Sequence, residues 1–359
     1  MNVACLAGPS AARGLPRWLR GLRGAVLTCC ASGAFALAGA QTAEFGGEPD
    51  PSAGPRQRSV SEWLARLQQT SRVPSYAGTF VVWSRNGAMS SSRIWHVSEG
   101  SVQMERVEVL SGQPRSIFRR NDTVVTFLPE SRTVRTVQRE AGGVFFNLLA
   151  VDVIGSTADF YTARAIGADR VAGFDADIVE LIPRDDLRFG YRIWSEKRTG
   201  LVIKTQTIQP PGSVLEQAAF SELQLNAPVK ASSLWRMMSN TKGYKVEKSE
   251  RVPTTAESEG WGMKAPVPGF KPQSCYRRAE TAAAPMVQWI FSDGLATVSL
   301  FIEPFDAQRH LREAAAAMGA THTLTRRLTA AGADWWITAV GEVPAPTLGA
   351  FVDNLERRD

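Results

Sequence analysis

The chain has 359 residues, with 41 Lys and Arg against 35 Asp and Glu, and a formal net charge of +6. Four Arg and no acid lie in the first 40 residues, so the charge beyond them is +2 (6 − 4), which argues against a nucleic-acid binder. Only Cys275 lies beyond residue 40, and this excludes an internal disulfide or a zinc cluster of several thiolates there.

The first 40 residues have the pattern of a secretory signal peptide. Four Arg precede an apolar run from Ala25 to Ala38, and Ala38-Gly39-Ala40 is a small-x-small cleavage site. The run has about 14 residues, which is fewer than the ~20 that a membrane-spanning helix needs. We therefore expect residues 1–40 to be a signal peptide, with export and a mature chain that begins near Gln41.

An amphipathic helix is predicted after a flexible segment. Residues 41–58 are rich in Gly, Pro, Ser and Gln, a composition typical of flexible chain. Apolar residues then recur at i, i+3, i+4 and i+7, namely Val60, Trp63, Leu64 and Leu67. Ser59 and Glu62 have the spacing of a capping box at the helix start. Such a helix needs a sheet on which to bury its apolar face.

Residues 59–240 are predicted to form an N-terminal domain built on a curved antiparallel sheet. Segments of alternating apolar and polar residues are separated by short turns, as in a meander. They are 79–85, 92–97, 101–110, 115–120, 123–128, 132–138, 161–167, 174–183, the hairpin 189–208, and 215–225. Residues 144–160 are predicted to be helical or irregular. A change of parity between Met104 and Val107 predicts a β-bulge.

A second, smaller α+β domain is predicted at residues 261–359. It follows a short helix at 229–238 and a polar, charged stretch at 241–260 that is typical of a linker. Its predicted elements are a hairpin at 287–302 around Ser292-Asp293-Gly294, an Ala-rich helix at 308–318, strands at 324–328 and 334–340, and a helix at 346–356. The fold class expected for both domains is α+β.

The sequence offers no catalytic constellation. His96, His310 and His322 lie far apart without metal-ligand spacing, and no G-x-S-x-G, Walker A or G-x-G-x-x-G motif occurs. Asp185 and Asp186 are adjacent carboxylates, which on a strand would point to opposite faces, and they fit a solvated turn better. We expect no enzyme, no metal and no cofactor.

Aromatic side chains on successive strands are the first candidate binding feature. A strongly curved sheet with a helix against it can enclose an apolar hollow that holds acyl chains. The pattern alone favours the alternative, an ordinary closed core. The candidates for a lipid cavity are Phe80, Trp83, Trp95, Phe118, Phe127, Tyr191 and Trp194.

A basic pair beside an aromatic strand is the second candidate feature. Aromatic anchors flanked by Arg are the composition of an interface hot spot. Such pairs suit lipid phosphates, lipopolysaccharide or acidic peptide segments, while the alternative is an ordinary solvated strand edge. The candidates for partner binding are Arg277, Arg278, Trp289, Phe291 and Phe301.

Five segments between about residues 59 and 355 resemble the MucB/RseB family in sequence and in order. They are YAGTF (Tyr76–Phe80), RVAGFDADIVELIPRD (Arg170–Asp185), YRIWSEKRTGLVIKTQ (Tyr191–Gln206), WIFSDGLATVSLFIE (Trp289–Glu303) and GEVPAPTLGAFVDNL (Gly341–Leu355). The resemblance implies a periplasmic regulator of the sigma-E envelope stress response. Such a regulator binds the periplasmic segment of a membrane-spanning anti-sigma factor and shields it from site-1 proteolysis.

The resemblance also implies a role for each domain. The N-terminal domain would be a LolA/LolB-like half-barrel whose cavity senses lipid, lipopolysaccharide or mislocalised lipoprotein, and the C-terminal domain would make much of the anti-sigma contact. The alternative is a periplasmic lipoprotein or lipid carrier of the LolA type. A simple carrier does not need a second domain of about a hundred residues, which favours the regulator. Whether the chain forms a homo-oligomer stays open.

Overall fold

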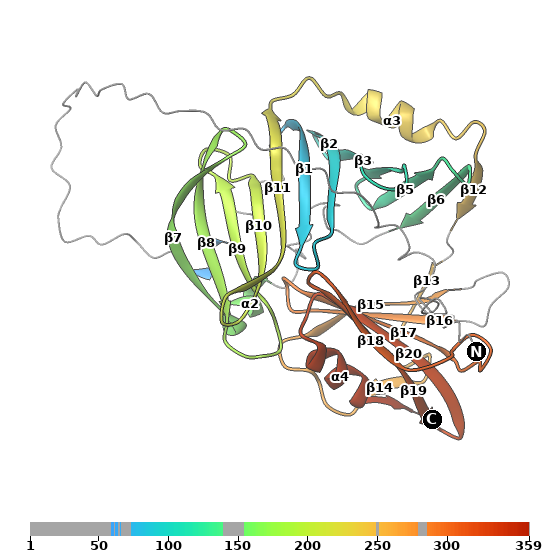
Figure 1. The fold of residues 1–359 in the computed structure, drawn as a ribbon. Coiled ribbons are helices and arrows are strands. Elements are labelled where there is room, and N and C mark those ends of the chain that lie inside the picture. The colour runs from blue at the N-terminus through green and yellow to red at the C-terminus, as the bar shows by residue number, and fades with distance from the viewer. Residues whose placement is uncertain are drawn as a thin grey trace, which may run out of the picture.

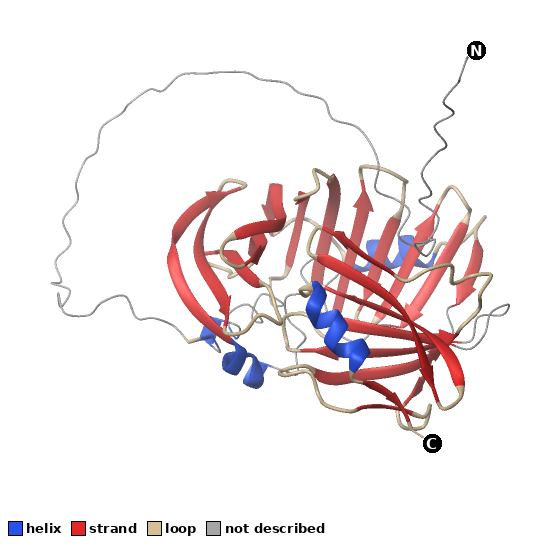
Figure 2. Cartoon of the chain, turned by 60° about the horizontal axis from the view of Figure 1, so that its bottom comes forward, coloured by secondary structure: helices blue, strands red, loops and turns tan. Residues whose placement is uncertain are grey.

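Two largely antiparallel sheets dominate the protein, seen here in a computed structural model that describes residues 59, 60, 62, 63, 65, 73–138, 154–248, 251–278 and 286–358. A curved sheet of twelve strands lies above a sheet of seven strands (Figure 1), and a pair of short strands forms a third sheet. Few helices accompany them (Figure 2). The expected α+β class with a curved N-terminal sheet is confirmed.

The twelve-stranded sheet consists of two meanders joined side by side. Its order is β12-β6-β5-β4-β3-β2-β1-β11-β10-β9-β8-β7, and β1 pairs with β11 where the meanders meet. The strands are β1 (Ser75–Ser84), β2 (Met89–Glu99), β3 (Val102–Val109), β4 (Ser116–Arg120), β5 (Thr123–Leu128), β6 (Thr133–Gln138), β7 (Tyr161–Val171), β8 (Phe174–Pro183), β9 (Gly190–Glu196), β10 (Val202–Gln209), β11 (Ser213–Leu225) and β12 (Lys245–Lys248). Every strand predicted from the alternating pattern is present, which confirms the meander.

Helices cover both faces of this sheet. The predicted capping box is confirmed, because Ser59 N donates to Glu62 Oε2 at 2.7 Å and Glu62 N donates to Ser59 Oγ at 3.2 Å. Val60 and Trp63 of that helix pack with residues of β7–β10. Helix α2 (Ile154–Phe160) falls inside the segment predicted to be helical or irregular, and residues 139–153 lie outside the described part. Helix α3 (Ala231–Ser239) crosses β2–β4.

The predicted bulge in β3 is wrong. Pairing of β3 with both neighbours runs without a register shift. The parity changes because both faces of the strand are covered: Met104 packs beneath α3, and Val107 packs with Ile94 in a different cluster. Bulges lie elsewhere, for example between Val202 and Lys204 of β10.

The seven-stranded sheet has the order β13-β15-β16-β17-β20-β19-β18. Its strands are β13 (Arg251–Thr254), β15 (Lys271–Arg278), β16 (Met286–Ser292), β17 (Thr297–Pro304), β18 (Ala314–Met318), β19 (Thr321–Ala330) and β20 (Ala333–Gly341), while β14 (Trp261–Met263) pairs with β21 (Leu355–Arg357). Helix α4 (Ala345–Asp353) packs on one face (Figure 2) and contributes Leu348, Phe351 and Val352 to the core. The predicted hairpin and closing helix are confirmed.

The predicted Ala-rich helix is wrong. Residues Ala314–Met318 form the edge strand β18, which pairs with β19. The preceding segment is fixed by His310, whose ring stacks on Trp336 with centroids 4.8 Å apart and whose Nε2 lies 3.3 Å from a Glu303 oxygen. Pairing and packing therefore override the high helix propensity of Ala.

The predicted linker contributes to both sheets. Strand β12 pairs in parallel with β6 of the first sheet, and β13 pairs with β15 of the second. The passage from one sheet to the other thus lies between Lys248 and Arg251. Across the described ranges, no helix is long and apolar enough to span a membrane.

Candidate functional site

The seven aromatic candidates for a lipid cavity fall into three separate apolar clusters rather than one. Trp95, Phe118 and Phe127 belong to the cluster beneath α3. Phe80 and Trp194 belong to a second cluster, and Tyr191 to a third that also contains Val60 and Trp63. Trp83 is 38% exposed and belongs to none of them. The described side chains therefore do not bring all seven together around a single hollow.

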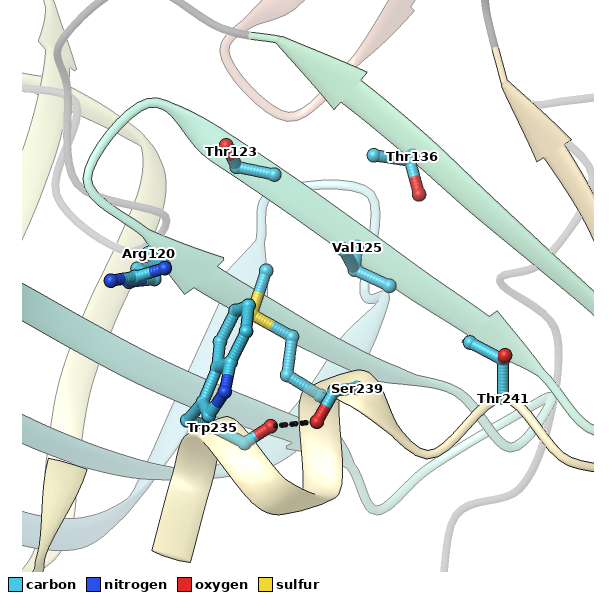
Figure 3. A pocket seen from close by; sticks show the side chains of 8 residues that line it. Arg120, Thr123, Val125, Thr136, Trp235, Ser239 and Thr241 are labelled. Carbon is cyan, nitrogen blue, oxygen red and sulfur yellow. Dashed lines mark hydrogen bonds between the residues drawn. The ribbon is translucent and has the colours of Figure 1, made fainter. Parts of the chain in front are cut away.

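A small pocket opens between α3 and strands β4–β6 (Figure 3). Its volume is about 250 Å³, below the ~300–1,000 Å³ typical of pockets for drug-sized ligands. The Arg120 guanidinium lies 4.5 Å from the centre of the Trp235 ring, and Ser239 Oγ donates to the Trp235 carbonyl at 2.7 Å. Val125 and Met238 connect the pocket to the cluster that holds Phe118 and Phe127. The pocket suits a short apolar group with an anionic end near Arg120.

A buried polar group lies on the same sheet and was missed from the sequence. His96 Nδ1 lies 3.1 Å from Glu105 Oε1, and Arg119 Nη1 lies 3.6 Å from Glu105 Oε2. Tyr76 stacks on His96 with ring centroids 4.7 Å apart. Burial, followed by the Glu105 charge, raises the pKa of Tyr76 above its ordinary value. These residues come from β1–β4, and no local sequence pattern could have grouped them.

The partner-binding candidates of the C-terminal domain separate into core and surface. Trp289 and Phe291 are 7% and 4% exposed and pack in the core beneath α4. Phe301 is half-buried and lies on the face of the sheet opposite to Trp289 and Phe291. The Arg278 guanidinium lies 5.7 Å from the centre of its ring. Arg277 instead forms an ion pair with Glu259, at 2.7 Å.

Arg277 therefore borders a second surface pocket. This pocket has a volume of about 630 Å³ and is lined by 257–260, Ala330, Ala331, Ala333, Trp335, Arg357 and Arg358. The Arg357 guanidinium lies between two indoles, 5.1 Å from the centre of Trp261 and 4.8 Å from that of Trp335. Two Glu, Glu257 and Glu259, line the pocket together with Arg357 and Arg358, so its lining does not select an acidic ligand.

The joint between the two domains is built around Arg188, which the sequence did not single out. Arg188 lies in the β8–β9 loop and its side chain is fully buried. Its Nη1 donates to Asp293 Oδ2 at 2.8 Å, its Nη2 to the Pro268 carbonyl at 2.7 Å, and its Nε to Asp185 Oδ1 at 2.9 Å. The guanidinium also lies 4.5 Å from the centre of the Phe160 ring.

Asp293 makes the complementary contacts from the β16–β17 turn. Its Oδ1 accepts from the backbone N–H groups of Leu295 and Ala296, at 2.9 and 2.7 Å. Its Oδ2 accepts from the Tyr161 hydroxyl at 3.1 Å as well as from Arg188. Burial raises the pKa of Asp293, and the neighbouring Arg188 charge opposes that shift. The sequence identified this turn, but not its burial against the other domain.

The thiol of Cys275 should be almost inert in the folded protein. Burial, followed by the charges of Glu259 and Glu257, raises its pKa from 9.0 to about 11. At neutral pH the thiolate is then about a hundredfold rarer than at the ordinary value, and the thiolate is the reactive form. The neutral thiol is favoured on folding below the unfolded pKa, and this contribution to stability is lost as pH rises through about 11.

Iodoacetamide labelling followed by peptide mass spectrometry measures this reactivity. We expect Cys275 to be alkylated at least about a hundredfold more slowly than a thiol introduced by Ser221→Cys at an exposed position. In denaturant the two rates should converge. Equal rates in the native protein would contradict the burial of this thiol.

No group of three or more His, Cys, Asp or Glu within the described ranges could hold a metal ion. The three His have structural partners. His322 Nδ1, for example, lies 2.7 Å from the Val343 carbonyl oxygen.

Comparison with known proteins gives a consistent result over both domains. The family model of the MucB/RseB N-terminal domain matches residues 59–238, and that of the MucB/RseB C-terminal domain matches residues 255–356. The chain is 30% identical over 298 residues to the sigma factor AlgU regulatory protein MucB of Pseudomonas aeruginosa, covering 80% of this chain and 88% of that protein.

Two further relatives extend this comparison. The chain is 24% identical to the sigma-E factor regulatory protein RseB of Haemophilus influenzae, over 70% of this chain and 78% of that protein. Among solved structures, the MucA/MucB complex of Pseudomonas aeruginosa matches with a TM-score of 0.65 and 26% identity. This match covers 84% of the chain and 99% of the matched chain.

Proposed function

The chain belongs to the MucB/RseB family, and from this premise we propose that it is a periplasmic regulator that binds the periplasmic segment of a membrane-spanning anti-sigma factor. Binding shields that segment from site-1 proteolysis and keeps the sigma factor sequestered. Lipid, lipopolysaccharide or lipoprotein would relieve the shielding under envelope stress. The protein acts by binding and is not an enzyme.

The match of both family models, in order along one chain, is the observation that carries this proposal. The relatives are named as regulators of a sigma factor, and one solved relative is a complex of MucB with MucA. The signal-peptide pattern before Gln41 supports export to the periplasm.

Surface chemistry supports a division of labour between the domains. In the C-terminal domain, Arg278 stacks on Phe301 and Arg251 on Tyr276, with each guanidinium 5.7 Å from its ring centre. Arg and aromatic side chains together are typical of interface hot spots. In the N-terminal domain, the three aromatic clusters and the pocket beside Trp235 are the candidates for sensing an acyl group.

A protection assay tests the proposal directly. The anti-sigma periplasmic segment from the same organism is incubated with the site-1 protease, with and without the purified mature chain. We expect the chain to slow cleavage and to bind the segment in calorimetric titration. Deleting the gene should raise sigma-E-dependent transcription, and re-expression should restore it. Absence of binding, together with unchanged cleavage and transcription, would refute the proposal.

If the N-terminal domain senses lipid, substitution of Trp83 or Trp194 should change the response to lipid more than it changes basal partner binding. Trp83→Ala removes an exposed side chain, so stability and basal partner affinity should stay within about 0.5 kcal/mol, or about twofold. Trp194→Ala removes a ring that is only 4% exposed, and its stability must be measured alongside. For both variants we expect vesicles of phosphatidylethanolamine and phosphatidylglycerol to weaken partner binding less than they weaken it for the wild type.

The readout is calorimetric titration of the partner segment with and without these vesicles. Met89→Ala provides the matched control, since Met89 is the cross-strand neighbour of Trp83 and is 66% exposed. If the vesicles affect both Trp variants as strongly as the wild type, these residues have no part in lipid sensing.

A further inference from the structure

The joint between the domains has the geometry of a plug in a socket. The plug is the β16–β17 turn, Ser292–Ala296, of the C-terminal domain. Leu295 at its tip is 5% exposed and packs in an apolar cluster whose other members, including Tyr161, Tyr191 and Ile193, all come from the N-terminal domain. The turn is therefore inserted into the core of the other domain.

The socket holds the plug by polar contacts from three N-terminal segments. Thr157 Oγ1, on α2, donates to the Asp293 carbonyl at 3.0 Å. The Tyr161 hydroxyl, at the start of β7, and the Arg188 guanidinium, in the β8–β9 loop, both donate to Asp293 Oδ2. Because Asp293 Oδ1 accepts two N–H groups of its own turn, one side chain both shapes the plug and anchors it.

The fit around Arg188 leaves no space for a larger residue in the facing loop. Gly269 has a φ of +83°, and a Cβ there would lie 2.8 Å from an Arg188 terminal nitrogen and 2.9 Å from the Phe160 ring. A second contact reinforces the joint, since Thr347 Oγ1 at the start of α4 donates to the Leu187 carbonyl at 2.9 Å. Elements from both domains therefore enclose the Arg188 side chain.

The electrostatics of this joint favour one orientation over others. A buried ion pair adds little net stability, since desolvation offsets the attraction between its charges. Removing one partner, however, leaves a buried charge uncompensated, which is strongly unfavourable. A rotated arrangement that kept the apolar contacts buried would separate Arg188 from Asp293, so it is disfavoured. The pair thus selects an orientation more than it adds affinity between the domains.

We propose that the Asp293 turn and the Arg188 socket form a latch that locks the two domains in one orientation, and that the latched orientation is the form that binds the partner segment. The second clause rests on the proposed function. The latched turn joins β16 directly to β17, which carries Phe301, the ring on which Arg278 of β15 stacks. Release of the turn would therefore uncouple the partner-binding strands from the N-terminal domain.

Two substitutions and their combination test the latch. Asp293→Asn keeps the shape of the side chain but removes its charge, and Arg188→Met removes the charge of its partner. The double variant leaves neither member of the fully buried pair charged, and Asp185, the other carboxylate on Arg188, is 29% exposed and reaches solvent. It therefore separates loss of the latch from simple misfolding. Arg164→Met is the control, because Arg164 forms an exposed ion pair with Glu180 away from the joint.

Small-angle scattering of the mature chain reports the domain orientation without any partner. We expect one compact arrangement for the wild type and the control, and a broader, larger ensemble for the three latch variants. Calorimetry should show a single unfolding transition that splits into two when the latch is lost. Wild-type scattering and a single transition in all three variants would overturn the latch.

Titration with the anti-sigma segment then tests whether the latched orientation is the form that binds the partner. If one variant molecule in ten is latched, its apparent Kd rises about tenfold. Variants that scatter as an open ensemble but bind with wild-type affinity would show that binding does not require the latched orientation. A wild-type chain that binds no segment at all would refute the proposed function, while the scattering result for the latch would still stand.

Discussion

A Trp289→Ala variant should lose about 3–5 kcal/mol of folding free energy in the C-terminal domain. The indole is 7% exposed, its centroid lies 4.6 Å from that of Phe291, and Cys275 and Leu300 flank it on the neighbouring strands. Removal of the ring leaves a cavity in a close-packed core. Because whole domains are stable by only about 5–15 kcal/mol, the loss is a large fraction of the total.

Denaturant unfolding followed by near-ultraviolet circular dichroism measures this loss. Phe301→Ala is the matched control: its ring is half-buried on the other side of the same sheet, so we expect a loss of only about 1 kcal/mol. The Trp289 variant should lose partner binding only to the extent that it is unfolded. A variant with wild-type stability that no longer binds the partner would instead make Trp289 an interface residue.

Strand positions could be predicted from the sequence because a period of two is a local signal. The alternation in 123–128 and 174–183 gave the bounds of β5 and β8 as they occur. The same rule failed for Ala314–Met318, where short side chains carry no alternation and pairing with β19 decides the structure. It also failed in β3, where clusters on both faces mimic a change of parity.

Which aromatic side chains meet could not be predicted in the same way. The face that a side chain occupies depends on every bulge between it and its neighbour, because a shift of one residue reverses the faces. Register shifts occur between Thr79 and Phe80 and between Val202 and Lys204, close to Phe80 and Trp194. The seven aromatics therefore divide among clusters in a way that no single strand reveals.

The contact between the two domains could not be predicted from the sequence for a different reason. Arg188 meets Asp293 and Pro268, which lie 105 and 80 positions further along the chain. Ser292-Asp293-Gly294 could be identified as a turn, because its side-chain and backbone bonds are local. Its burial by the other domain depends on how the two sheets pack, and neither local propensity nor periodicity encodes that packing.

Replacing both Arg277 and Arg278 by Ala should weaken binding of the anti-sigma segment by about 2 kcal/mol, or roughly thirtyfold. Neighbours on a strand point to opposite faces, so the two side chains cannot contribute to one contact equally. Arg277 turns toward Glu259 and the surface pocket beside it, whereas Arg278 stacks on Phe301. We therefore expect Arg278→Ala alone to account for most of the loss, and Arg277→Ala for little.

Calorimetric titration of the double and single variants at two salt concentrations decides this. Salt should weaken the wild-type complex more than the double variant, because exposed charges are screened. Arg326→Ala is the control, since Arg326 is a partly exposed Arg that pairs with Asp353 of α4. All variants should keep the wild-type unfolding midpoint. Wild-type affinity in the double variant would place the contact elsewhere. The two Arg would then serve only their contacts within the domain, Arg277 with Glu259 and Arg278 with Phe301.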